Sequence, residues 1–513
     1  MDTASDQAFT ALKGWMSKCS DSHEPCRRLL QMSQLPTRIV EIIDSKNVRL
    51  RETRREHGLY TCLSHCWGAQ PIIRTTTTSL STHLESIPWT DLPRTFQDAI
   101  DITSGLGIRH IWIDSLCIIQ DDLDDWRHEG SRMCDIYSKS HLTIAASKSE
   151  DSTGGCYAAS NTVDDKTHWF ENSKNEQYNV HVRTCIVHLG EEFNFLAQGI
   201  PTVFPLTKRA WVFQERLLSP RVVHFGPTEL YWECSTGTVC ECSDWNYDDK
   251  NKWLGKRLQD PSGAVTAIEQ CKIWHSLVEE YTKKDLQYDT DIFPALQGIA
   301  KLLQHQVDYF AGVWNTDTIL LDLLWHVRSG RRPAVWRAPT WSWASIKGEI
   351  GFFDLLDYVD SLASVVDIRT NPLGTDPFGQ LLSGHLELKG FLIEGLIEKF
   401  EECPSWCLLA SSVKFVSERR IRDESPGVVN HGGPEDKFGI FSPDCREELT
   451  KGQSVKIMAV ATMSYKNVEA TMCLAFVCAD PEKSIHTRVG LVTLPNDAGS
   501  FERFGTETVL TIV

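Results

Sequence analysis

The chain is short of basic side chains and has no long apolar run. Its 52 Lys and Arg residues stand against 69 Asp and Glu residues, which gives a formal net charge of −17. An acidic balance of this size argues against nucleic acid or an anionic membrane surface as the main partner. No apolar run reaches the roughly 18 residues that a membrane span needs, so we expect no span.

Other signatures are missing as well. The sequence contains no Gly-rich phosphate-binding loop of either common type, so an ATPase or GTPase module is not expected. Residues 1–6 show neither the basic nor the apolar segment of a secretory signal. No repeat period or low-complexity tract is present.

Cysteine and tryptophan are abundant, at 17 residues each in a chain of 513. Several cysteines lie inside apolar runs, as Cys62, Cys117 and Cys473 do. Without a secretory signal they are expected to be reduced thiols that pack as small apolar side chains. Each tryptophan can bury about 200 Å², and the length predicts roughly two to four domains with substantial cores.

Residues 58–147 combine short apolar runs with helical patterns. We predict strands near 60–64, 110–114 and 141–146, and helices at about 92–105 and 123–138. Strand, helix and strand in this order form a βαβ unit. The three strands should therefore lie parallel in one sheet with helices on both faces.

The stretch from Arg109 to Asp122 changes abruptly from apolar to polar at Asp114. Ligands of open α/β sheets bind outside the carboxyl ends of strands, which makes Asp114 and Ser115 candidates for a binding site. The alternative is that Asp114 only caps the next turn.

Weaker patterns flank this region. Residues 35–42 resemble an edge strand after a proline, and 49–57 a charged loop. Residues 148–200 are polar and irregular. Residues 205–219 predict a helix with Thr207 as its N-cap. A hairpin is expected at 222–234.

The second half of the chain changes character twice. Residues 262–330 show helical patterns, and the aromatic segment 336–345 is expected to pack those helices onto a core. Short alternating runs dominate after it, as at 386–393 and 455–463, so that part is predicted to be β-rich.

Cys19, His23 and Cys26 have the spacing of metal ligands. Structural zinc sites use four ligands, and no fourth is evident nearby in the sequence. The alternative is a helix and turn with a packed cysteine pair and a capping histidine, and no metal is assigned from the sequence.

Several motifs, taken together, resemble the fungal heterokaryon-incompatibility (HET) domain family. They lie in one order between residues 57 and 345. The matching pieces are Tyr60-x-x-Leu63-Ser64-x-x-Trp67-Gly68, Leu92-Pro93-x-Thr95-Phe96-x-Asp98-Ala99, Trp112-Ile113-Asp114-Ser115-Leu116-Cys117-Ile118-x-Gln120-Asp121, Met133-x-x-Ile136-Tyr137-Ser138, Arg209-Ala210-Trp211-x-x-Gln214-Glu215-Arg216-Leu217-Leu218-Ser219-Pro220-Arg221 and Thr340-Trp341-Ser342-Trp343-Ala344-Ser345. Ile119 stands where the family usually has Asn, and His65 where a tyrosine is common.

The resemblance implies an intracellular, cytoplasmic regulator of self and non-self recognition that can trigger cell death. It would act with other incompatibility proteins or by self-association. The HET domain is similar to the TIR domain, a flavodoxin-like α/β fold, some members of which cleave NAD at the nicotinamide–ribose bond. By this resemblance, Leu63-Ser64 ends the first TIR strand, and Glu215 is the catalytic glutamate. NAD would then be a substrate, and no resident cofactor is implied.

The residues themselves leave alternatives open for Glu215. A carboxylate near a ribose can stabilise an oxocarbenium-like transition state, with Asp114 and Ser64 beside it. Ser115, Trp67, Arg209 and Trp211 are the candidate nucleotide-binding residues, the tryptophans by stacking. Otherwise Glu215 forms a structural ion pair with Arg209 or Arg216, and Trp211 is core.

Cys117 is a second candidate, as a thiol nucleophile, although a cysteine between Leu116 and Ile118 usually belongs to a core.

We therefore predict an α/β protein with a TIR-like (flavodoxin-like) parallel sheet, a helical middle region and a β-rich C-terminal part. The predicted divisions are an N-terminal helical segment and edge strand (1–56), the HET domain (57–235), a helical region (236–345) and a β-rich domain (346–513). Two hypotheses for function remain: an enzyme acting on NAD or a related nucleotide, or a non-catalytic interaction module that signals by self-association or partner binding.

Overall fold

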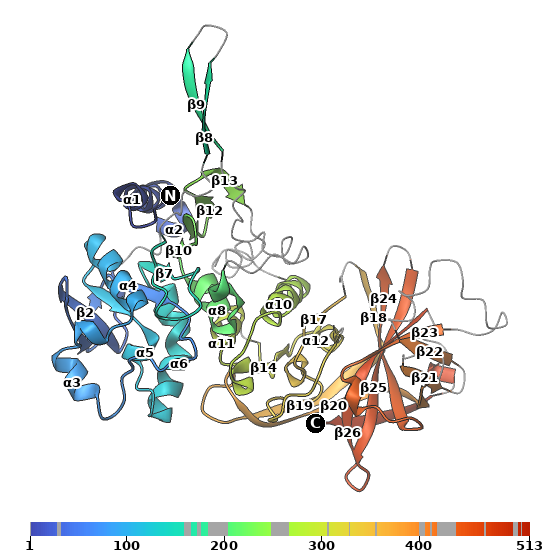
Figure 1. The fold of residues 1–513 in the computed structure, drawn as a ribbon. Coiled ribbons are helices and arrows are strands. Elements are labelled where there is room, and N and C mark those ends of the chain that lie inside the picture. Colours follow the sequence, from blue (N-terminus) through green and yellow to red (C-terminus); the bar gives the residue numbers. More distant parts are fainter. Residues whose placement is uncertain are drawn as a thin grey trace. The chain divides into compact units, whose positions relative to one another are not determined.

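The computed structural model describes most of the chain, and Figure 1 shows its elements. The described residues are 2–27, 32–158, 166–171, 176–182, 204–247, 266–304, 307–327, 329–353, 357–399, 406–410, 413–417, 438–465, 468–495, 501–503 and 505–513. The chain forms two compact units, Met1–Asp260 and Pro261–Val513. The four-part division made from the sequence stays a prediction.

A nine-stranded mixed sheet forms the centre of the first unit. Its strand order is β13-β12-β11-β10-β7-β5-β6-β2-β3. The strands are β2 (Arg38–Asp44), β3 (Asn47–Glu52), β5 (Thr61–Ser64), β6 (His110–Trp112), β7 (Leu142–Ala145), β10 (Arg221–Phe225), β11 (Leu230–Cys234), β12 (Gly237–Cys240) and β13 (Ser243–Tyr247). The four central strands β10, β7, β5 and β6 run parallel, and the flanking strands are antiparallel. The three predicted strands are confirmed as parallel neighbours, within a sheet that is mixed overall.

Helices cover both faces of the parallel strands, as predicted. Successive side chains of a strand point to opposite faces. Thr61 shares a 2.7 Å hydrogen bond with Thr103 of α4 (Arg94–Gly105), whereas the thiol of Cys62 contacts the Ile136 carbonyl of α6 (Leu123–Ser138). The two helices therefore lie on opposite faces.

The predicted edge strand and charged loop are corrected by the structure. β2 lies inside the sheet between β6 and β3, and β3 occupies residues 49–52 of the segment 49–57 that was predicted to be a loop. Val48 and Leu50 of β3 are buried, and Arg49 and Arg51 pair with Glu41 on β2. These ion pairs between neighbouring strands stabilise β3, although the charged composition of the segment alone predicts a loop.

The helix predicted at 205–219 is divided in two. A 3-10 turn, η3 (Pro205–Lys208), precedes α8 (Ala210–Leu218), and Arg209 is the N-cap residue of α8. Thr207 is therefore not the N-cap: its hydroxyl donates to the Phe204 carbonyl at 2.8 Å inside the 3-10 turn. The hairpin of β10 and β11 is confirmed.

Smaller elements complete the first unit. They are α1 (Asp6–Ser22), α2 (Glu24–Arg27), β1 (Ser33–Gln34), β4 (His57–Gly58), α3 (Leu80–Glu85), η1 (Trp89–Asp91), α5 (Asp114–Cys117), β8 (Lys166–Glu171) and β9 (Gln177–Val182). β8 and β9 form an antiparallel pair within the segment 148–200 that was predicted to be irregular. Residues 159–165, 172–175 and 183–200 of that segment lie outside the described residues.

The second unit begins with helices, as predicted, interrupted by short strands. The elements are α10 (Ala267–Tyr281), η4 (Asp289–Ile292), α11 (Gln297–Leu303), β14 (Tyr309–Phe310), β15 (Val313–Trp314), α12 (Ile319–Asp322), β16 (His326–Val327), η5 (Trp343–Ser345) and β17 (Ile350–Gly351). A capping box of Thr266 and Glu269 starts α10. In the aromatic segment, buried Trp343 contacts the rings of Tyr281 and Phe293, so this segment packs against the helices.

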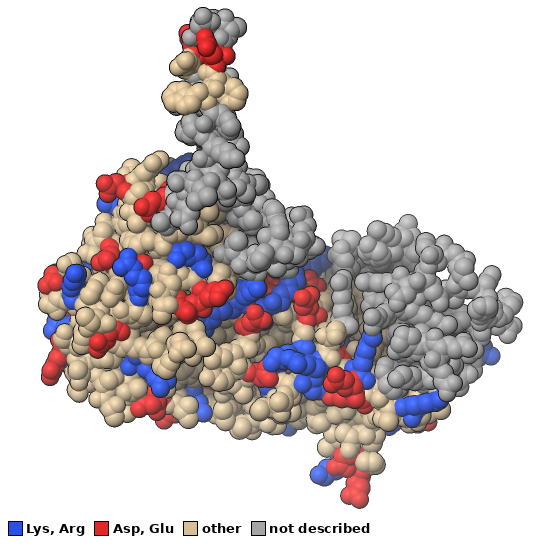
Figure 2. Space-filling model, viewed as in Figure 1, with Lys and Arg blue, Asp and Glu red and all other residues tan. Residues whose placement is uncertain are grey.

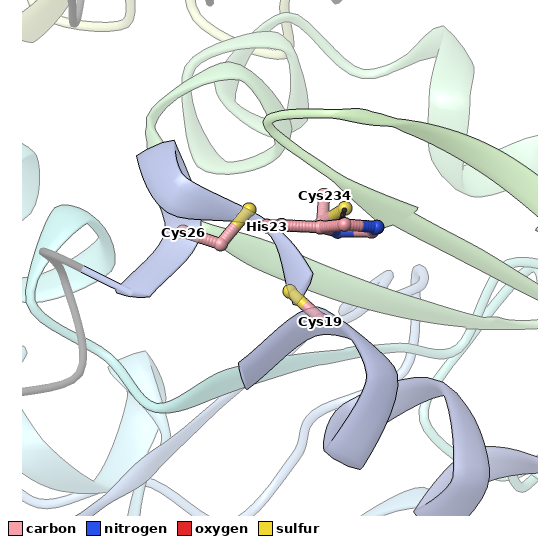
Figure 3. A group of neighbouring side chains, drawn as sticks. All are labelled: Cys19, His23, Cys26 and Cys234. Carbon is pink, nitrogen blue, oxygen red and sulfur yellow. Dashed lines mark hydrogen bonds between the residues drawn. The ribbon is translucent and has the colours of Figure 1, made fainter. Parts of the chain in front are cut away.

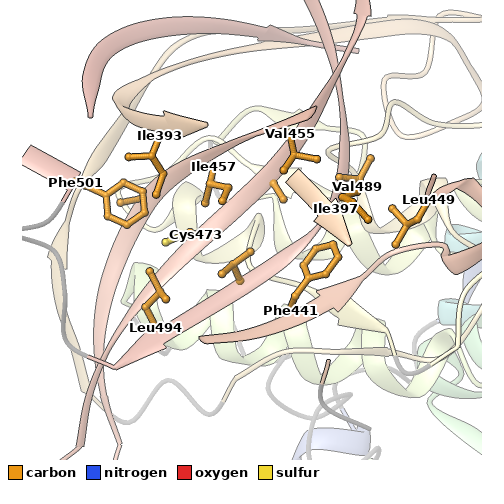
Figure 4. Close-up of a cluster of buried hydrophobic side chains, with 13 residues drawn as sticks. Ile393, Ile397, Phe441, Leu449, Val455, Ile457, Cys473, Val489, Leu494 and Phe501 are labelled. Carbon is orange, nitrogen blue, oxygen red and sulfur yellow. The ribbon is translucent and has the colours of Figure 1, made fainter. Parts of the chain in front are cut away.

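The rest of the second unit is a ten-stranded sheet, which confirms the β-rich prediction. Its strands are β18 (Asp357–Ser361), β19 (Ala363–Pro372), β20 (Leu381–Lys399), β21 (Trp406–Ala410), β22 (Val413–Ser417), β23 (Phe438–Pro443), β24 (Ser454–Tyr465), β25 (Val468–Asp480), β26 (Ile485–Pro495) and β27 (Thr506–Ile512), with the 3-10 turn η6 (Arg446–Glu448). β20 pairs with β24 as well as β21, so the path of paired strands returns on itself. A cluster of buried apolar side chains, among them Ile457, Phe441 and Leu494, fills the space between these strands (Figure 4).

A buried ion pair ties this sheet to the helical part of the same unit. Arg488 and Asp444 are fully buried, with 3.0 Å between Nε and Oδ2. Arg488 also donates to the carbonyls of Leu323 (2.5 Å) and Trp325 (2.6 Å), and its guanidinium lies 3.5 Å from the centre of the Trp325 ring.

Two properties of the surface and the helices bear on function. On the face drawn in Figure 2, acidic and basic side chains are intermixed. None of the described helices is long and apolar enough to cross a membrane.

Candidate functional site

Three of the predicted residues meet beside the carboxyl ends of the parallel strands. Ser64 is the last residue of β5, Asp114 follows β6 and begins α5, and Glu215 lies in the middle of α8. The Ser64 hydroxyl donates to Glu215 Oε2 at 2.5 Å. The pair is buried, with Ser64 2% and Glu215 6% exposed.

Asp114 is held at the partly exposed side of this cluster. Its Oδ2 accepts a 2.8 Å hydrogen bond from the Trp67 indole, and its Oδ1 accepts from the Ser115 amide at 2.7 Å. The side chain of Asp114 remains 25% exposed. Asp114 is thus the first residue of α5 and not its N-cap, which is Ile113 and makes no side-chain capping bond, so the capping alternative is not confirmed.

Gly68 permits the turn that carries Trp67. Its φ is +79°, and a Cβ there would lie 2.4 Å from Cβ of Asp151. Only glycine adopts this backbone without strain and admits the Asp151 loop so closely. The loop is also held by the Ser152 hydroxyl, which donates to the Cys66 carbonyl at 3.1 Å.

The two neighbouring arginines have other partners. Arg209 donates from Nη1 to the His65 carbonyl at 2.7 Å. Arg216 donates from Nε to Glu233 Oε2 at 2.8 Å, and His224 shares that carboxylate. In the described part of the chain neither arginine forms a salt bridge with Glu215, so the structural ion pair considered from the sequence is not formed.

Burial dominates the electrostatics of Glu215. It raises the pKa of the carboxyl from 4.5 to about 7, and the charge of Asp114 raises it further, whereas the Ser64 hydroxyl and the charge of Arg209 lower it. At neutral pH this carboxyl is therefore close to half protonated. Carboxyls with such shifted pKa values are concentrated in functional sites.

The side chains of Ser115 and Trp211 have environments that differ from those of the other candidates. Ser115 is fully buried, and its hydroxyl has no hydrogen-bond partner among the described residues. Trp211 is half-buried one turn before Glu215, and its ring meets Trp126 of α6 edge to face at 6.3 Å. Trp67 and Arg209 belong to the cluster itself.

Sequence reasoning did not single out two side chains of the cluster. The Tyr137 hydroxyl lowers the pKa of Glu215 by hydrogen bonding and lies 3.3 Å from the Leu63 carbonyl. His65 Nδ1 lies 3.9 Å from Asp114 Oδ1, and burial lowers the pKa of His65 to about 4, which keeps the ring neutral. Tyr137 is part of the motif Met133-x-x-Ile136-Tyr137-Ser138, and the spacing of that motif assigns it no role in the site.

The structure supports the core interpretation of Cys117. The residue is completely buried, and burial raises the pKa of its thiol to about 12. A thiol in this setting stays protonated and is a poor nucleophile.

Three groups of possible metal ligands in the described part of the chain lie outside this cluster, and one of them is formed by Glu229, Cys240 and Cys242. Cys19, His23 and Cys26 are joined by Cys234, a fourth residue that sequence spacing could not supply. In the second unit, Cys271, His275 and Asp322 are all buried. Cys271 Sγ (3.4 Å) and Asp322 Oδ1 (2.8 Å) both lie near Nε2 of His275. In a catalytic Cys-His-Asp triad the thiol and the carboxylate would bond to different ring nitrogens, so this group does not have the geometry of a triad.

Comparison with known proteins bears on the first unit. Residues 60–215 match the family model described as heterokaryon incompatibility protein (HET). The chain carries a HET domain. This confirms the resemblance seen in the motifs and indicates a protein related to heterokaryon incompatibility. No curated protein and no solved structure matches the chain.

The limits of the HET match enclose the cluster. The match begins at Tyr60, directly before β5, and ends at Glu215. Ser64, Trp67, Asp114, Tyr137 and Arg209 all lie between these limits. The HET domain therefore contains every side chain of the candidate site, and the four-residue cysteine and histidine group lies outside it.

Proposed function

We propose that the HET domain hydrolyses the nicotinamide–ribose bond of NAD, and that this reaction triggers cell death in heterokaryon incompatibility. The observation that carries the proposal is Glu215, a buried carboxyl with a pKa of about 7 that is bonded to Ser64 at the end of a parallel strand. NAD is present in the cytoplasm, and the proposal places the protein there.

The strand order supports a TIR-like, flavodoxin-like interpretation of the domain. Taken across the sheet, the parallel strands are β6, β5, β7 and β10. In chain order this is second, first, third and fourth, which agrees with the flavodoxin-like order. In that arrangement ligands bind at the carboxyl ends of the strands where the order reverses, and Ser64 ends the strand at that point.

The chemistry assigns one step to Glu215. As a carboxylate it stabilises the oxocarbenium character that develops at C1′ of the ribose while the C1′–N bond breaks and its electron pair leaves with nicotinamide. Water then bonds to C1′ and gives ADP-ribose, and Glu215 takes the released proton and passes it to solvent. A carboxyl with a pKa of about 7 is suited to accepting and releasing a proton at neutral pH.

The remaining candidates serve binding. Asp114 accepts from the ribose hydroxyls in addition to the Trp67 indole. Trp67 and Trp211 are partly exposed rings suited to stacking on nicotinamide or adenine. Arg209 supplies a positive charge for the pyrophosphate. Ser115 contributes through its amide, which orients Asp114.

Expression in a fungal host tests the proposal. Wild-type protein should lower cellular NAD and viability, and Glu215→Gln should do neither at equal protein level. Glu129→Gln is the matched control, because Glu129 is a buried carboxylate of the same unit on α6. Undiminished killing by Glu215→Gln would exclude the enzymatic proposal.

A second candidate function is an interaction module that signals by self-association or by binding a partner. The observation in its favour is the β8–β9 pair, on which Trp169 is 69% and Phe170 47% exposed. Exposed aromatic side chains are typical of protein interfaces. In this case Trp169→Ser would abolish killing, whereas Glu215→Gln would not, and cellular NAD would stay constant.

A further inference from the structure

Four possible metal ligands converge where α1 and α2 meet β11, outside the HET match. Cys19, His23, Cys26 and Cys234 each offer a ligand atom, and these atoms all lie within 4.8 Å of one another. Figure 3 shows the four side chains pointing toward a common space. His23 Nδ1 and Cys234 Sγ are 3.4 Å apart. In a tetrahedral zinc site, bond lengths of about 2.3 Å to sulfur and 2.0–2.1 Å to nitrogen put ligand atoms about 3.6–3.8 Å apart.

The local fold explains how three of the ligands come together. α1 ends at Ser22, and the amide of His23 donates to the Cys19 carbonyl at 3.3 Å. α2 starts at once with Glu24, and the Arg27 amide donates to the His23 carbonyl at 3.0 Å. The chain therefore turns about His23 and brings Cys26 back toward Cys19.

The fourth ligand comes from the sheet. Cys234 is the last residue of β11 and pairs with Arg221 on β10. The Thr236 hydroxyl, in the turn after β11, lies 3.7 Å from Cys26 Sγ. The Trp15 ring on α1 lies 6.5 Å from that of Trp232 on β11. The N-terminal helix thus meets this strand along its length.

Arg221 is a second, independent observation that points to a bound metal, because its buried positive charge has no negative partner among the described residues. It is 1% exposed and donates from Nε to Cys19 Sγ at 3.3 Å and from Nη2 to the Ser20 hydroxyl at 3.1 Å. No carboxylate pairs with it in the described part of the chain. A buried cation without a counter-charge is costly. A Zn²⁺ ion with three thiolates and a neutral histidine carries a net charge of −1, which would balance the guanidinium.

We propose that Cys19, His23, Cys26 and Cys234 bind a structural zinc ion that fixes α1 and α2 to β11. Soft thiolates with one imidazole select zinc over magnesium, calcium or manganese. All four positions are filled by protein ligands, as in structural sites, and none is left for substrate. The ion closes a loop between the N-terminus and the strand that follows the HET match.

Metal analysis of the full chain tests the proposal. Protein purified without chelators should contain one more zinc ion per chain than Cys234→Ser. Cys156→Ser is the matched control: Cys156 is buried in the same unit, and a serine can keep its contact with the Thr95 carbonyl, so this variant should match wild type. A strong chelator should lower the melting temperature of wild type and the control, and should leave that of Cys234→Ser unchanged.

Cobalt substitution decides the matter even if Cys234→Ser fails to fold. Wild type loaded with Co²⁺ should show the intense visible bands of a tetrahedral site and sulfur-to-cobalt charge transfer. His23→Cys should keep the metal and increase the charge-transfer intensity, because a fourth thiolate replaces imidazole. Wild type without these bands, an unchanged spectrum for His23→Cys, or a disulfide among the three cysteines in freshly purified protein would overturn the proposal.

Discussion

Glu215 combines features that a residue selected only for stability would not have. It is 6% exposed, its bonded partner is the uncharged Ser64 hydroxyl, and Asp114 adds a like charge nearby. Burying a carboxylate in this setting disfavours its ionised form. Burial of Glu215 therefore lowers the free energy of unfolding by an amount that rises with pH. Such shifted carboxyls are common in functional sites.

The sign of that cost gives the first prediction. The folded pKa of Glu215, about 7, exceeds its unfolded value near 4.5, so the folded state binds the proton more tightly than the unfolded state. The contribution of the protonated carboxyl to the free energy of unfolding is therefore complete below about pH 4.5 and is lost as the pH rises to 7. The loss amounts to about 3 kcal/mol. Glu215→Gln should be more stable than wild type at pH 8 by up to that amount and nearly equal at pH 4.

Urea unfolding at a series of pH values measures this difference. The exposed Glu85→Gln is the control and should follow the wild-type profile. A Glu215→Gln variant that is less stable than wild type at pH 8 would contradict the predicted burial of charge.

At the residue scale the sequence predicted part of the site. Ser64 and Asp114 could be placed because each follows an apolar run, and strand ends gather at one edge of a parallel sheet. Tyr137 and His65 could not, since their contacts with Glu215 and Asp114 depend on how α6 and β5 pack. Cys234 could not either, because its partners Cys19, His23 and Cys26 lie in a different part of the sequence and meet it only in the folded sheet.

Among the elements, those with apolar residues on both faces were predictable. β5, β6 and β7 are short buried runs whose order along the chain fixes a parallel arrangement. β3 was missed because its arginines suggested a loop, and its pairing with Glu41 becomes visible only when β2 lies beside it. The start of α8 was placed too early because Thr207 is also a good residue for a 3-10 turn.

A pair of glycine substitutions tests the turn that carries Trp67. Gly68→Ala should lower the free energy of unfolding by about 1–3 kcal/mol, because its φ is positive and Asp151 leaves no room for a Cβ. Gly14→Ala is the matched control in the exposed middle of α1, where a Cβ would meet nothing within 4 Å. It should raise stability by about 1 kcal/mol. Equal melting temperatures for the two variants would refute this account of the turn.

At the scale of the whole molecule, each unit has a core of its own. Trp112 is fully buried in the first unit and meets Tyr137 edge to face at 5.7 Å. Arg488 is the buried ion-pair partner of Asp444 in the second. The division at residues 260 and 261 keeps these two centres in separate units.

A single substitution in one core should therefore lower the stability of that unit and leave the other unit unchanged. Trp112→Ala should cost about 3–5 kcal/mol through lost packing. Arg488→Ala should cost a similar 3–5 kcal/mol, because Asp444 is left buried and unpaired. Hydrogen exchange should quicken first in β5–β7 for the former variant and in β23–β26 for the latter. Exchange that quickens equally in both units for either variant would contradict two separate cores.

The most direct test of the central claim is release of nicotinamide by purified protein incubated with NAD. We predict that wild type releases nicotinamide at a rate that rises with pH through about 7, as Glu215 ionises. Glu215→Gln should be slower by about 10²–10³ because the stabilising charge is gone. Folded Glu215→Gln that releases nicotinamide as fast as wild type, or wild type that releases none across this pH range, would contradict the account.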